Sequence, residues 1–388
     1  MIDRLAIEGY RSIRSLVVDL GPLTVVTGRN GTGKSSLYRA LRLLAAAGQA
    51  RAVAELAADG GLDAVRWAGP ERIARAVREG GPTEGLVRSG PVAVRLGFGA
   101  ADGLGYAIDL GLPVPLSSAG ALCMFDRDPD IKQEHVFAGL DPRPASVLVE
   151  RRGALVRARG DDGWRELSRG IAPWTSVLDE QAGTPDAPEI AGVRRTIRGW
   201  RFHDAFRTDA GAPARQPQVG TRSPRLDDDG ANLAAVLRTS IEAGLDREIG
   251  RAVAEAFDGS ALEIVVHDGR MTPALRQQGM LRMLTAAELS DGTLQFLLLV
   301  AALTSVERPS LIVLNEPERS LHAELVAPLA ALIRRASEQT QVLVVTHQAQ
   351  LAAALGGTAV GLEKVHGETL VAGREGPLDQ PSWHWPKR

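Results

Sequence analysis

The stretch Gly28-Arg29-Asn30-Gly31-Thr32-Gly33-Lys34-Ser35 decides the fold of this chain. It fits the pattern G-x-x-x-x-G-K-[ST] and directly follows a short apolar run, Leu23–Val26. Leu37, Leu41 and Leu44 then mark one face of a helix. Small residues let the backbone curl so that several N–H groups point at one anion, and the start of the helix adds positive potential. The pattern predicts a phosphate-binding loop between a strand and a helix.

The composition limits the remaining possibilities. The chain has 388 residues, 45 basic and 47 acidic, and a formal net charge of −2. Such a balance excludes a generally cationic nucleic-acid coat but leaves room for a local basic patch. A single cysteine, Cys123, excludes an intramolecular disulfide framework and a cysteine-rich zinc site. No apolar run has the length of a signal peptide or a membrane span, so we expect a cytoplasmic protein without a membrane partner.

The loop predicts ATP and Mg²⁺ as cofactors. Lys34 supplies a point charge for the β- and γ-phosphates, and Ser35 supplies a hydroxyl for Mg²⁺. The alternative is a chance match in a glycine-rich chain, which is disfavoured because only four residues of the chain are lysines. We expect the following residues to contact the nucleotide: Asn30, Gly31, Thr32, Gly33, Lys34, Ser35 and Ser36.

A second motif follows a buried apolar run near the C-terminus. The strand Ser310–Leu314 leads into Asn315 and Glu316, an arrangement typical of a Walker B motif. In such a motif one residue belongs to the coordination shell of Mg²⁺, and the other orients the attacking water. The usual first residue is aspartate, and the amide carbonyl of Asn315 is a weaker Mg²⁺ partner. We expect Glu316 to act as the general base or to orient water. The alternative is a strand that ends at an ordinary helix N-cap.

The presence of these motifs predicts nucleotide contacts at two further places in the chain, Ser290 with Gly292 and His347. Ser290 and Gly292 precede an apolar helix, Gly292–Ser305, where a hydroxyl and free N–H groups form a second anion cradle. Alone, this pattern would indicate only a good N-cap. His347 follows a predicted strand, Gln341–Thr346, and from there a histidine can contact the γ-phosphate, although a lone histidine is usually structural.

Taken together, the motifs resemble a known family. The ordered set resembles the RecF/SMC-like branch of the ABC-type ATPases and, more narrowly, the stand-alone predicted ATPases of the AAA_21 type, relatives of the ATPase half of overcoming-lysogenization-defect nucleases. The resemblance implies an α/β P-loop NTPase with a mostly parallel core sheet, an antiparallel β lobe and an inserted helical lobe. Its motifs are Tyr10-Arg11-Ser12, Gly28–Ser35, Leu289–Gly292, Asn315–Glu318, Ser320-Leu321-His322 and Thr346-His347.

The resemblance also implies how the motifs work. ATP joins two copies of the chain. The nucleotide is contacted by Lys34, Asn315, Glu316 and His347 of one copy and by Ser290 and Gly292 of the other copy. Ser320–His322 corresponds to the D-loop, and Arg11 lies near the nucleotide. The metal is held through Ser35 and Asn315. Of two glutamines that could serve as the Q-loop residue, Gln133 is favoured over Gln181.

The cellular role is implied only broadly. DNA maintenance, DNA repair or anti-phage defence is expected, with double-stranded DNA and a separately encoded effector protein as partners. The family's nuclease activity does not carry over, because no acidic cluster follows residue 350. Eight arginines with three aromatics between residues 194 and 225 could grip a phosphate backbone. We favour the other interpretation, an arginine-rich surface balanced by neighbouring aspartates.

The predicted domain organisation has four parts: 1–135 and 261–375 form the two halves of the ATPase head, 136–260 is an inserted helical lobe, and 376–388 is a tail. Further elements expected from periodicity are helices in 50–80 and at Asn232–Leu245, and strands at Leu5–Glu8, Leu16–Leu20, Val92–Leu96, Tyr106–Leu110, Ala121–Phe125 and Leu262–Val266.

Three other functions stay open. A nucleotide-gated binding module would use ATP as a clamp for a protein partner, with hydrolysis slowed by Asn315. A transporter's nucleotide-binding subunit would not need so long an insertion. A small-molecule P-loop kinase leaves Ser290, Gly292 and His347 unexplained.

Overall fold

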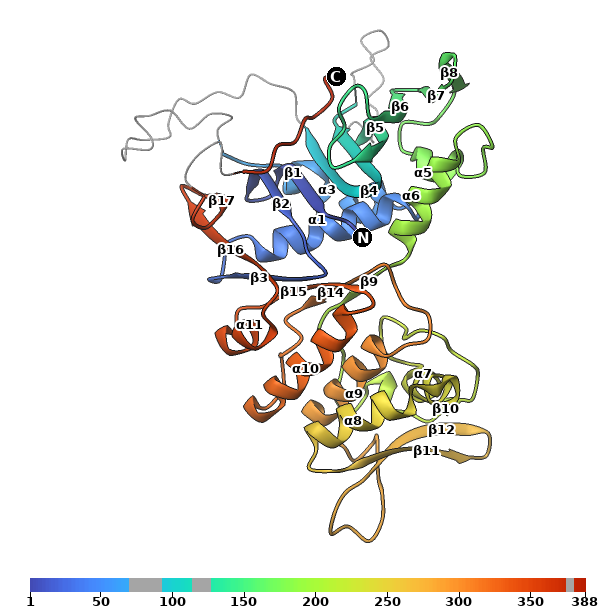
Figure 1. Ribbon diagram of the computed structural model, residues 1–388, viewed down its shortest axis with the longest axis vertical. Coiled ribbons are helices and arrows are strands. Elements are labelled where there is room, and N and C mark those ends of the chain that lie inside the picture. The colour runs from blue at the N-terminus through green and yellow to red at the C-terminus, as the bar shows by residue number, and fades with distance from the viewer. Residues whose placement is uncertain (70–92, 114–126, 375–379) are drawn as a thin grey trace. The chain divides into compact units, whose positions relative to one another are not determined.

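The computed structural model describes residues 1–69, 93–113, 127–374 and 380–388 (Figure 1). The chain divides into two compact units, and each is assembled from separated segments. Unit 1 comprises Met1–Gly21, Gly28–Trp200 and Val360–Arg388; unit 2 comprises Pro22–Thr27 and Arg201–Ala359. These units divide the chain at other places than the predicted domains, and the boundary at 135/136 falls inside a strand. The predicted strand Ala121–Phe125 and Cys123 lie outside the described residues.

Unit 1 is built on a seven-stranded antiparallel sheet, the predicted β lobe. Its order is β2-β1-β4-β5-β6-β7-β8, and all its pairings are antiparallel. The strands are β1 (Arg4–Tyr10), β2 (Ile13–Asp19), β4 (Val94–Gly111), β5 (Asp130–Gly139), β6 (Val147–Arg152), β7 (Leu155–Gly160) and β8 (Gly163–Ser168). The last three strands lie in a region that the sequence pattern assigned to a helical insertion.

Helix α1 (Lys34–Ala47) begins at the phosphate loop and contacts β1 and β4. Its apolar face, which includes Leu37, Leu41 and Leu44, is buried as the periodicity predicts. The remaining elements of this unit are α2 (Ala52–Ala58), α3 (Gly61–Val65), α5 (Val177–Glu180), α6 (Pro188–Arg198) and, from Val360 onward, a hairpin of β16 (Thr358–Val365) and β17 (Glu368–Val371). The chain passes from unit 1 into unit 2 at β9 (Trp200–His203).

The last nine residues of the chain lie against the β lobe. Trp383 packs edge-on against Phe137, and Arg388 forms an ion pair with Asp109 at 2.6 Å. The side-chain amide of Gln133 donates to the Lys387 carbonyl at 2.9 Å. The structure thus places the favoured Q-loop glutamine on β5, beside this tail.

Unit 2 contains the predicted parallel core. β3 (Leu23–Gly28) pairs in parallel with β15 (Gln341–Val345), and β15 pairs in parallel with β14 (Leu311–Asn315). Their apolar residues are almost entirely buried, as expected for strands covered on both faces. Because the three strands are parallel, their carboxyl ends lie at one edge of the sheet.

Helices cover this core. α9 (Asp291–Leu303) is buried along nearly its whole length, and α10 (Val326–Ser337) and α8 (Asp246–Ala256) contact it and each other (Figure 1). The predicted helix Asn232–Leu245 is shorter: α7 (Leu233–Ser240) passes into a π-helical turn, η2 (Ile241–Leu245), where Gly244 has a φ of 92°. The other helical elements are η1 (Pro213–Arg215), η3 (Ala323–Leu325) and α11 (Ala349–Leu355).

A small antiparallel sheet completes unit 2. β12 (Arg270–Arg276) pairs with β10 (Gln218–Val219), β11 (Ala261–His267) and β13 (Leu284–Thr285). None of the described helices combines the length and the apolar character that crossing a membrane requires.

Candidate functional site

The phosphate loop begins at the end of β3 and ends at the start of α1. Gly33, the residue before α1, has a φ of 104°, a left-handed conformation that favours glycine. A Cβ atom there would lie 2.1 Å from Oγ1 of Thr369 on β17, so no larger residue fits. The sequence therefore needs glycine at position 33 for both its backbone and its close neighbour.

Lys34 is buried within the loop. Its Nζ donates to the carbonyl oxygens of Gly28 at 2.6 Å and Arg29 at 3.1 Å, and the Thr32 hydroxyl also donates to Arg29 at 2.9 Å. The ammonium is thus held among backbone groups that close the loop. Ser35, in the first turn of α1, is exposed.

Ser36 is buried in the first turn of α1. Its hydroxyl is 3.3 Å from that of Ser12, which in turn is 2.8 Å from Oγ1 of Thr369. These three hydroxyls form a cluster that joins the end of β1, the start of α1 and β17. Sequence reasoning listed Ser36 as a nucleotide contact and missed Thr369, because Thr369 lies more than 300 residues away in the chain.

Arg11 is held by its neighbours. Its guanidinium pairs with Asp59 at 3.0 Å, and its Nε donates to the Tyr10 hydroxyl at 3.4 Å. Burial alone would lower the pKa of Arg11, but the hydrogen bonds with Tyr10 and Asp59 raise it. Burial is also the main reason why the pKa of Tyr10 rises to about 12. Both side chains therefore keep their neutral-pH charge states.

The Walker B pair stands at the carboxyl end of β14. Asn315 is the last residue of the strand, and its Nδ2 donates to Oδ1 of Asp204 at 2.9 Å. Glu316 follows with a φ of 50°, an uncommon value for a residue other than glycine. Its N–H donates to the Val345 carbonyl at the end of β15 at 2.8 Å, so the neighbouring strand supports this backbone conformation.

His347 joins this pair from the next strand. Its Nδ1 lies 3.3 Å from Oε1 of Glu316 and 3.8 Å from Oε1 of Glu318. Glu318 is buried and accepts a hydrogen bond from the Thr346 hydroxyl, while among the described residues its Oε2 has no hydrogen-bond partner. Sequence reasoning paired Glu316 with His347 but gave no role to Glu318, whose burial could not be read from the pattern.

The segment Leu289–Gly292, here called the signature loop, opens α9. Ser290 is the N-cap, and its hydroxyl accepts from the Thr293 N–H at 3.2 Å. A Cβ atom on Gly292 would lie 3.0 Å from the Ser320 carbonyl. A cavity of about 920 Å³ is lined by residues of both motifs, and the structure thereby brings together the predicted signature and D-loop positions: Ser290, Gly292, Thr293, Ser320, Leu321 and His322.

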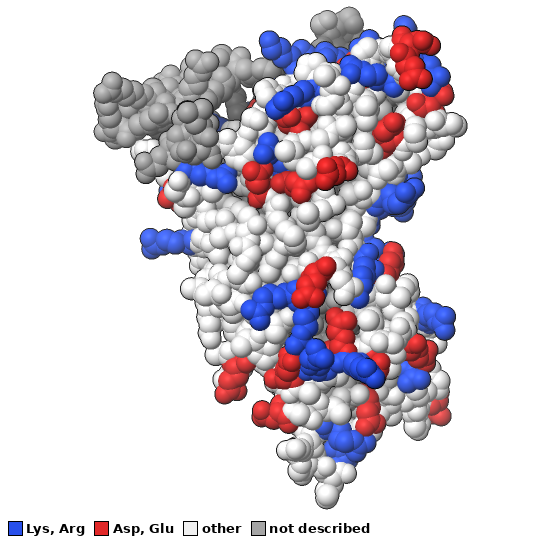
Figure 2. All heavy atoms as spheres, viewed as in Figure 1, with Lys and Arg blue, Asp and Glu red and all other residues white. Residues whose placement is uncertain are grey.

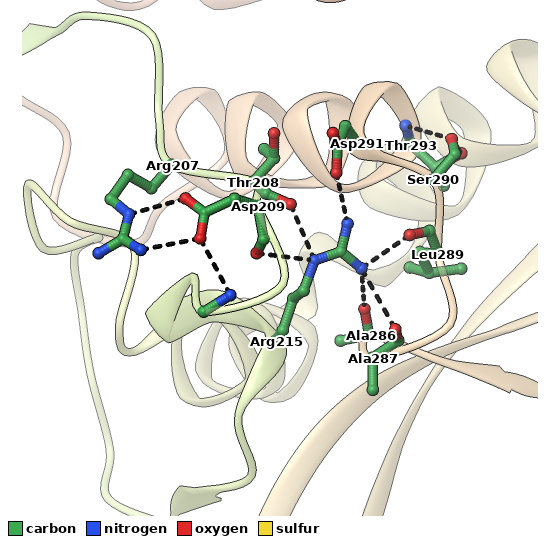
Figure 3. Close-up of polar contacts among 11 residues, drawn as sticks. Arg207, Thr208, Asp209, Arg215, Ala286, Ala287, Leu289, Ser290, Asp291 and Thr293 are labelled. Atoms are coloured by element: carbon green, nitrogen blue, oxygen red, sulfur yellow. Dashed lines mark hydrogen bonds and ion pairs between the residues drawn. The ribbon is translucent and has the colours of Figure 1, made fainter.

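Arg215 forms hydrogen bonds with the signature loop and with the residues just before it (Figure 3). Its side chain is buried and donates to the carbonyls of Ala286 at 2.9 Å and Leu289 at 2.7 Å, and to Oδ1 of Asp291 at 2.7 Å. Its Nε also donates to the Thr208 carbonyl at 2.8 Å. One guanidinium thus ties the segment around residues 208–215 to the start of α9.

Four of the other seven arginines of this region also approach acidic side chains. Arg194 pairs with Asp179, Arg207 with Asp209, and both Arg201 and Arg225 approach Glu307. On the face drawn in Figure 2, basic and acidic side chains are interspersed. These contacts support the balanced-surface interpretation of the segment that we favour from sequence.

The fold is similar to that of a solved SMC head. Solved structures with a similar fold include the SMC head bound to the C-terminal winged-helix domain of ScpA, with 13% identity, a TM-score of 0.52, and coverage of 96% of this chain and 97% of that one. The SMC head domain from Thermotoga maritima has 14% identity, a TM-score of 0.47, and coverage of 96% and 98%. No curated protein matches the chain.

The first of these structures shows the fold alone, that of an SMC head, which is a P-loop ATPase. A family model gives the closer assignment, because it spans residues 23–353 and so includes the phosphate loop, the signature loop, Asn315, Glu316 and His347. The chain belongs to the AAA_21 family, described as "AAA domain, putative AbiEii toxin, Type IV TA system".

Proposed function

We propose that this chain binds and hydrolyses ATP with Mg²⁺, and that it does so in a dimer that encloses two nucleotides. The observation that carries the proposal is the shared edge of three parallel strands. β3 leads into the phosphate loop, β14 ends at Asn315 and Glu316, and β15 leads into His347. In open α/β sheets, ligands bind at this edge.

Each side chain has a task in the reaction. Lys34 neutralises phosphate charge, and the backbone N–H groups of the loop bind the phosphate oxygens. The hydroxyl of Ser35 is a hard donor that fits Mg²⁺, and the amide oxygen of Asn315 fits a water bound to the ion. When bound, Mg²⁺ would neutralise charge on the transferred phosphoryl group. Glu316 orients the attacking water and accepts its proton.

His347 acts on Glu316 and on the phosphate. At 3.3 Å from the Glu316 carboxylate, its Nδ1 fixes the rotamer of the base when it carries a proton. In the imidazolium form both ring nitrogens carry a proton, so the opposite nitrogen can at the same time donate to a phosphate oxygen. The buried Glu318, through the Thr346 hydroxyl, keeps the residue before His347 in place.

The signature loop supports the dimer. Ser290 is exposed at the N-terminus of a thirteen-residue helix, where N–H groups and the helix dipole favour an anion. We propose that it binds the triphosphate held by the second copy, which makes the interface isologous. Ser320–His322, in the same cavity, lies between the two sites.

We further propose a role in DNA maintenance, DNA repair or anti-phage defence, with double-stranded DNA or a separately encoded effector as partner. The family description supports a defence role, since it names a putative toxin. A second candidate is a nucleotide-gated binding module, favoured by Asn315 in place of a carboxylate. If this second candidate function is correct, Asn315→Asp should raise ATP turnover sharply.

The test is ATP turnover with and without double-stranded DNA, at low and moderate salt. The wild-type chain should hydrolyse ATP, and Lys34→Ala should not. Lys364→Ala, which removes an exposed lysine, is the matched control and should behave as wild type. Stimulation that fades with salt would support the DNA partner, whereas equal turnover in Lys34→Ala would refute the site.

A further inference from the structure

Asn315 stands where a Walker B motif usually has an aspartate, and its side chain contacts Asp204. Its Nδ2 donates to Oδ1 of Asp204 at 2.9 Å, and Asp204 directly follows β9. An ionised carboxylate can only accept hydrogen bonds, so the amide nitrogen has to face Asp204. The oxygen is then the end of the amide that remains to accept from another group.

We propose that Asp204 is a positioning residue for the metal: it supplies the negative charge that Asn315 lacks, and it orients the Asn315 oxygen toward a water of Mg²⁺. The inference rests on the proposed ATPase function and deepens it. Mg²⁺ usually keeps several waters and is held through one or two carboxylates in addition to phosphate oxygens. The pair of Asp204 and Asn315 provides one carboxylate and one amide oxygen at the end of β14.

The contact also has the chemistry of an outer-shell partner. A carboxylate that accepts from an amide polarises it and makes the amide oxygen a better acceptor, as outer-shell carboxylates do for other metal ligands. Asp204 itself is exposed, although it is flanked by the buried His203. A single exposed hydrogen bond of this kind contributes about 1 kcal/mol to stability, so its removal should not unfold the protein.

The experiment compares the affinity for a fluorescent ATP analogue in Mg²⁺ and in EDTA. Asp204→Asn keeps an oxygen that can accept from Asn315 but removes the charge. We expect it to weaken binding in Mg²⁺ by about tenfold. In EDTA the affinity should stay the same or rise, because a negative charge near the triphosphate is lost. A folding defect would weaken binding in both buffers.

The exchange variant Asp204→Asn with Asn315→Asp decides the question. It reverses the hydrogen bond and returns the carboxylate to the site from the other side. It should restore most of the increase in affinity for the ATP analogue that Mg²⁺ gives the wild-type chain. Asn315→Asp alone is a poorer test, because it sets two carboxylates against each other. Asp268→Asn, which removes a charge from the exposed turn between β11 and β12, is the matched control and should match wild type.

Two results would overturn the inference: Asp204→Asn equal to wild type in both buffers, or an exchange variant no better than Asp204→Asn. If the wild-type chain gains nothing from Mg²⁺ in binding the analogue, the proposed function fails and the inference fails with it. If the wild-type gain is present and Asp204→Asn leaves it intact, only the inference fails.

Discussion

Nδ1 of His347 lies 3.3 Å from Oε1 of Glu316, although the two residues are separated by the helix α10 and the strand β15. The parallel pairing of β14 with β15 creates this contact, because Asn315 is in register with Val345. The side chains that follow the two strands therefore meet. Glu316, which we propose as the base, is thus held beside the histidine that we propose as a phosphate contact.

This contact predicts the effect of His347→Gln. The variant should bind ATP as wild type does, while kcat falls by about ten- to a thousandfold, because orientation and charge at the reacting phosphate are lost. Steady-state kinetics separate the two quantities. His366→Gln, in the exposed turn between β16 and β17, should leave both unchanged. A loss of ATP affinity with kcat preserved would show that His347 serves binding only.

The contacts of Arg215 with the signature loop predict that its substitution lowers turnover of the nucleotide held by the other copy. Arg215→Ala leaves the carbonyls of Ala286 and Leu289 without their donor and releases Asp291, so the signature loop should lose its position. Nucleotide binding to the isolated chain should persist, but turnover should fall sharply. Arg207→Ala, which removes an exposed side chain of the same segment that pairs with Asp209, is the matched control.

Mixed dimers test whether this loss acts between copies. Lys34→Ala and Arg215→Ala should each be inactive alone. If the signature loop serves the partner's nucleotide, a mixed dimer keeps one intact site, and an equal mixture should recover turnover that neither variant shows alone. An inactive mixture, with both variants folded, would place the effect of Arg215 within its own copy.

Two buried histidines predict an acid sensitivity of the fold. Burial lowers the pKa of His203 to about 4 against the opposing attraction of Asp228, and burial lowers the pKa of His135 to about 4 against that of Glu150. The unfolded value is about 6.5. Between these two values the unfolded chain binds more protons, so stability is complete above pH 6.5 and is lost as the pH falls toward 4.

The expected slope is about 1.4 kcal/mol per pH unit for each of the two histidines. Urea unfolding at several pH values should show a shallower dependence for His203→Gln than for wild type. The exposed histidine His267 provides the control variant, His267→Gln, which should keep the wild-type slope. An unchanged slope in His203→Gln would mean that His203 is protonated in the folded protein.

The motifs were predictable because each is local. The phosphate loop, the strand before Asn315 and the N-cap at Ser290 are all coded by neighbouring residues, and the structure places each on the expected element. The parallel core also followed from buried apolar runs that alternate with helices. The cavity that Ser290 and Ser320 line together was not predicted from the sequence.

The supporting contacts were not predictable, since each depends on residues far apart in the chain. Asp204 reaches Asn315 across more than a hundred residues, and Arg215 reaches Asp291 across more than seventy. Arg215 resembled its exposed neighbours in sequence, yet it is buried. The region 136–260 was predicted as a helical insertion because its strands, β6–β8, are short and rich in arginine and glycine.

The central claim, a dimer closed by ATP, is tested most directly by light scattering of Glu316→Gln with saturating ATP and Mg²⁺. The variant keeps the shape of Glu316 but cannot accept the proton of water, so bound ATP should persist and hold two copies together. We predict the mass of a dimer with ATP and that of a monomer when Lys34→Ala is added. A monomer with ATP bound to Glu316→Gln would contradict the account.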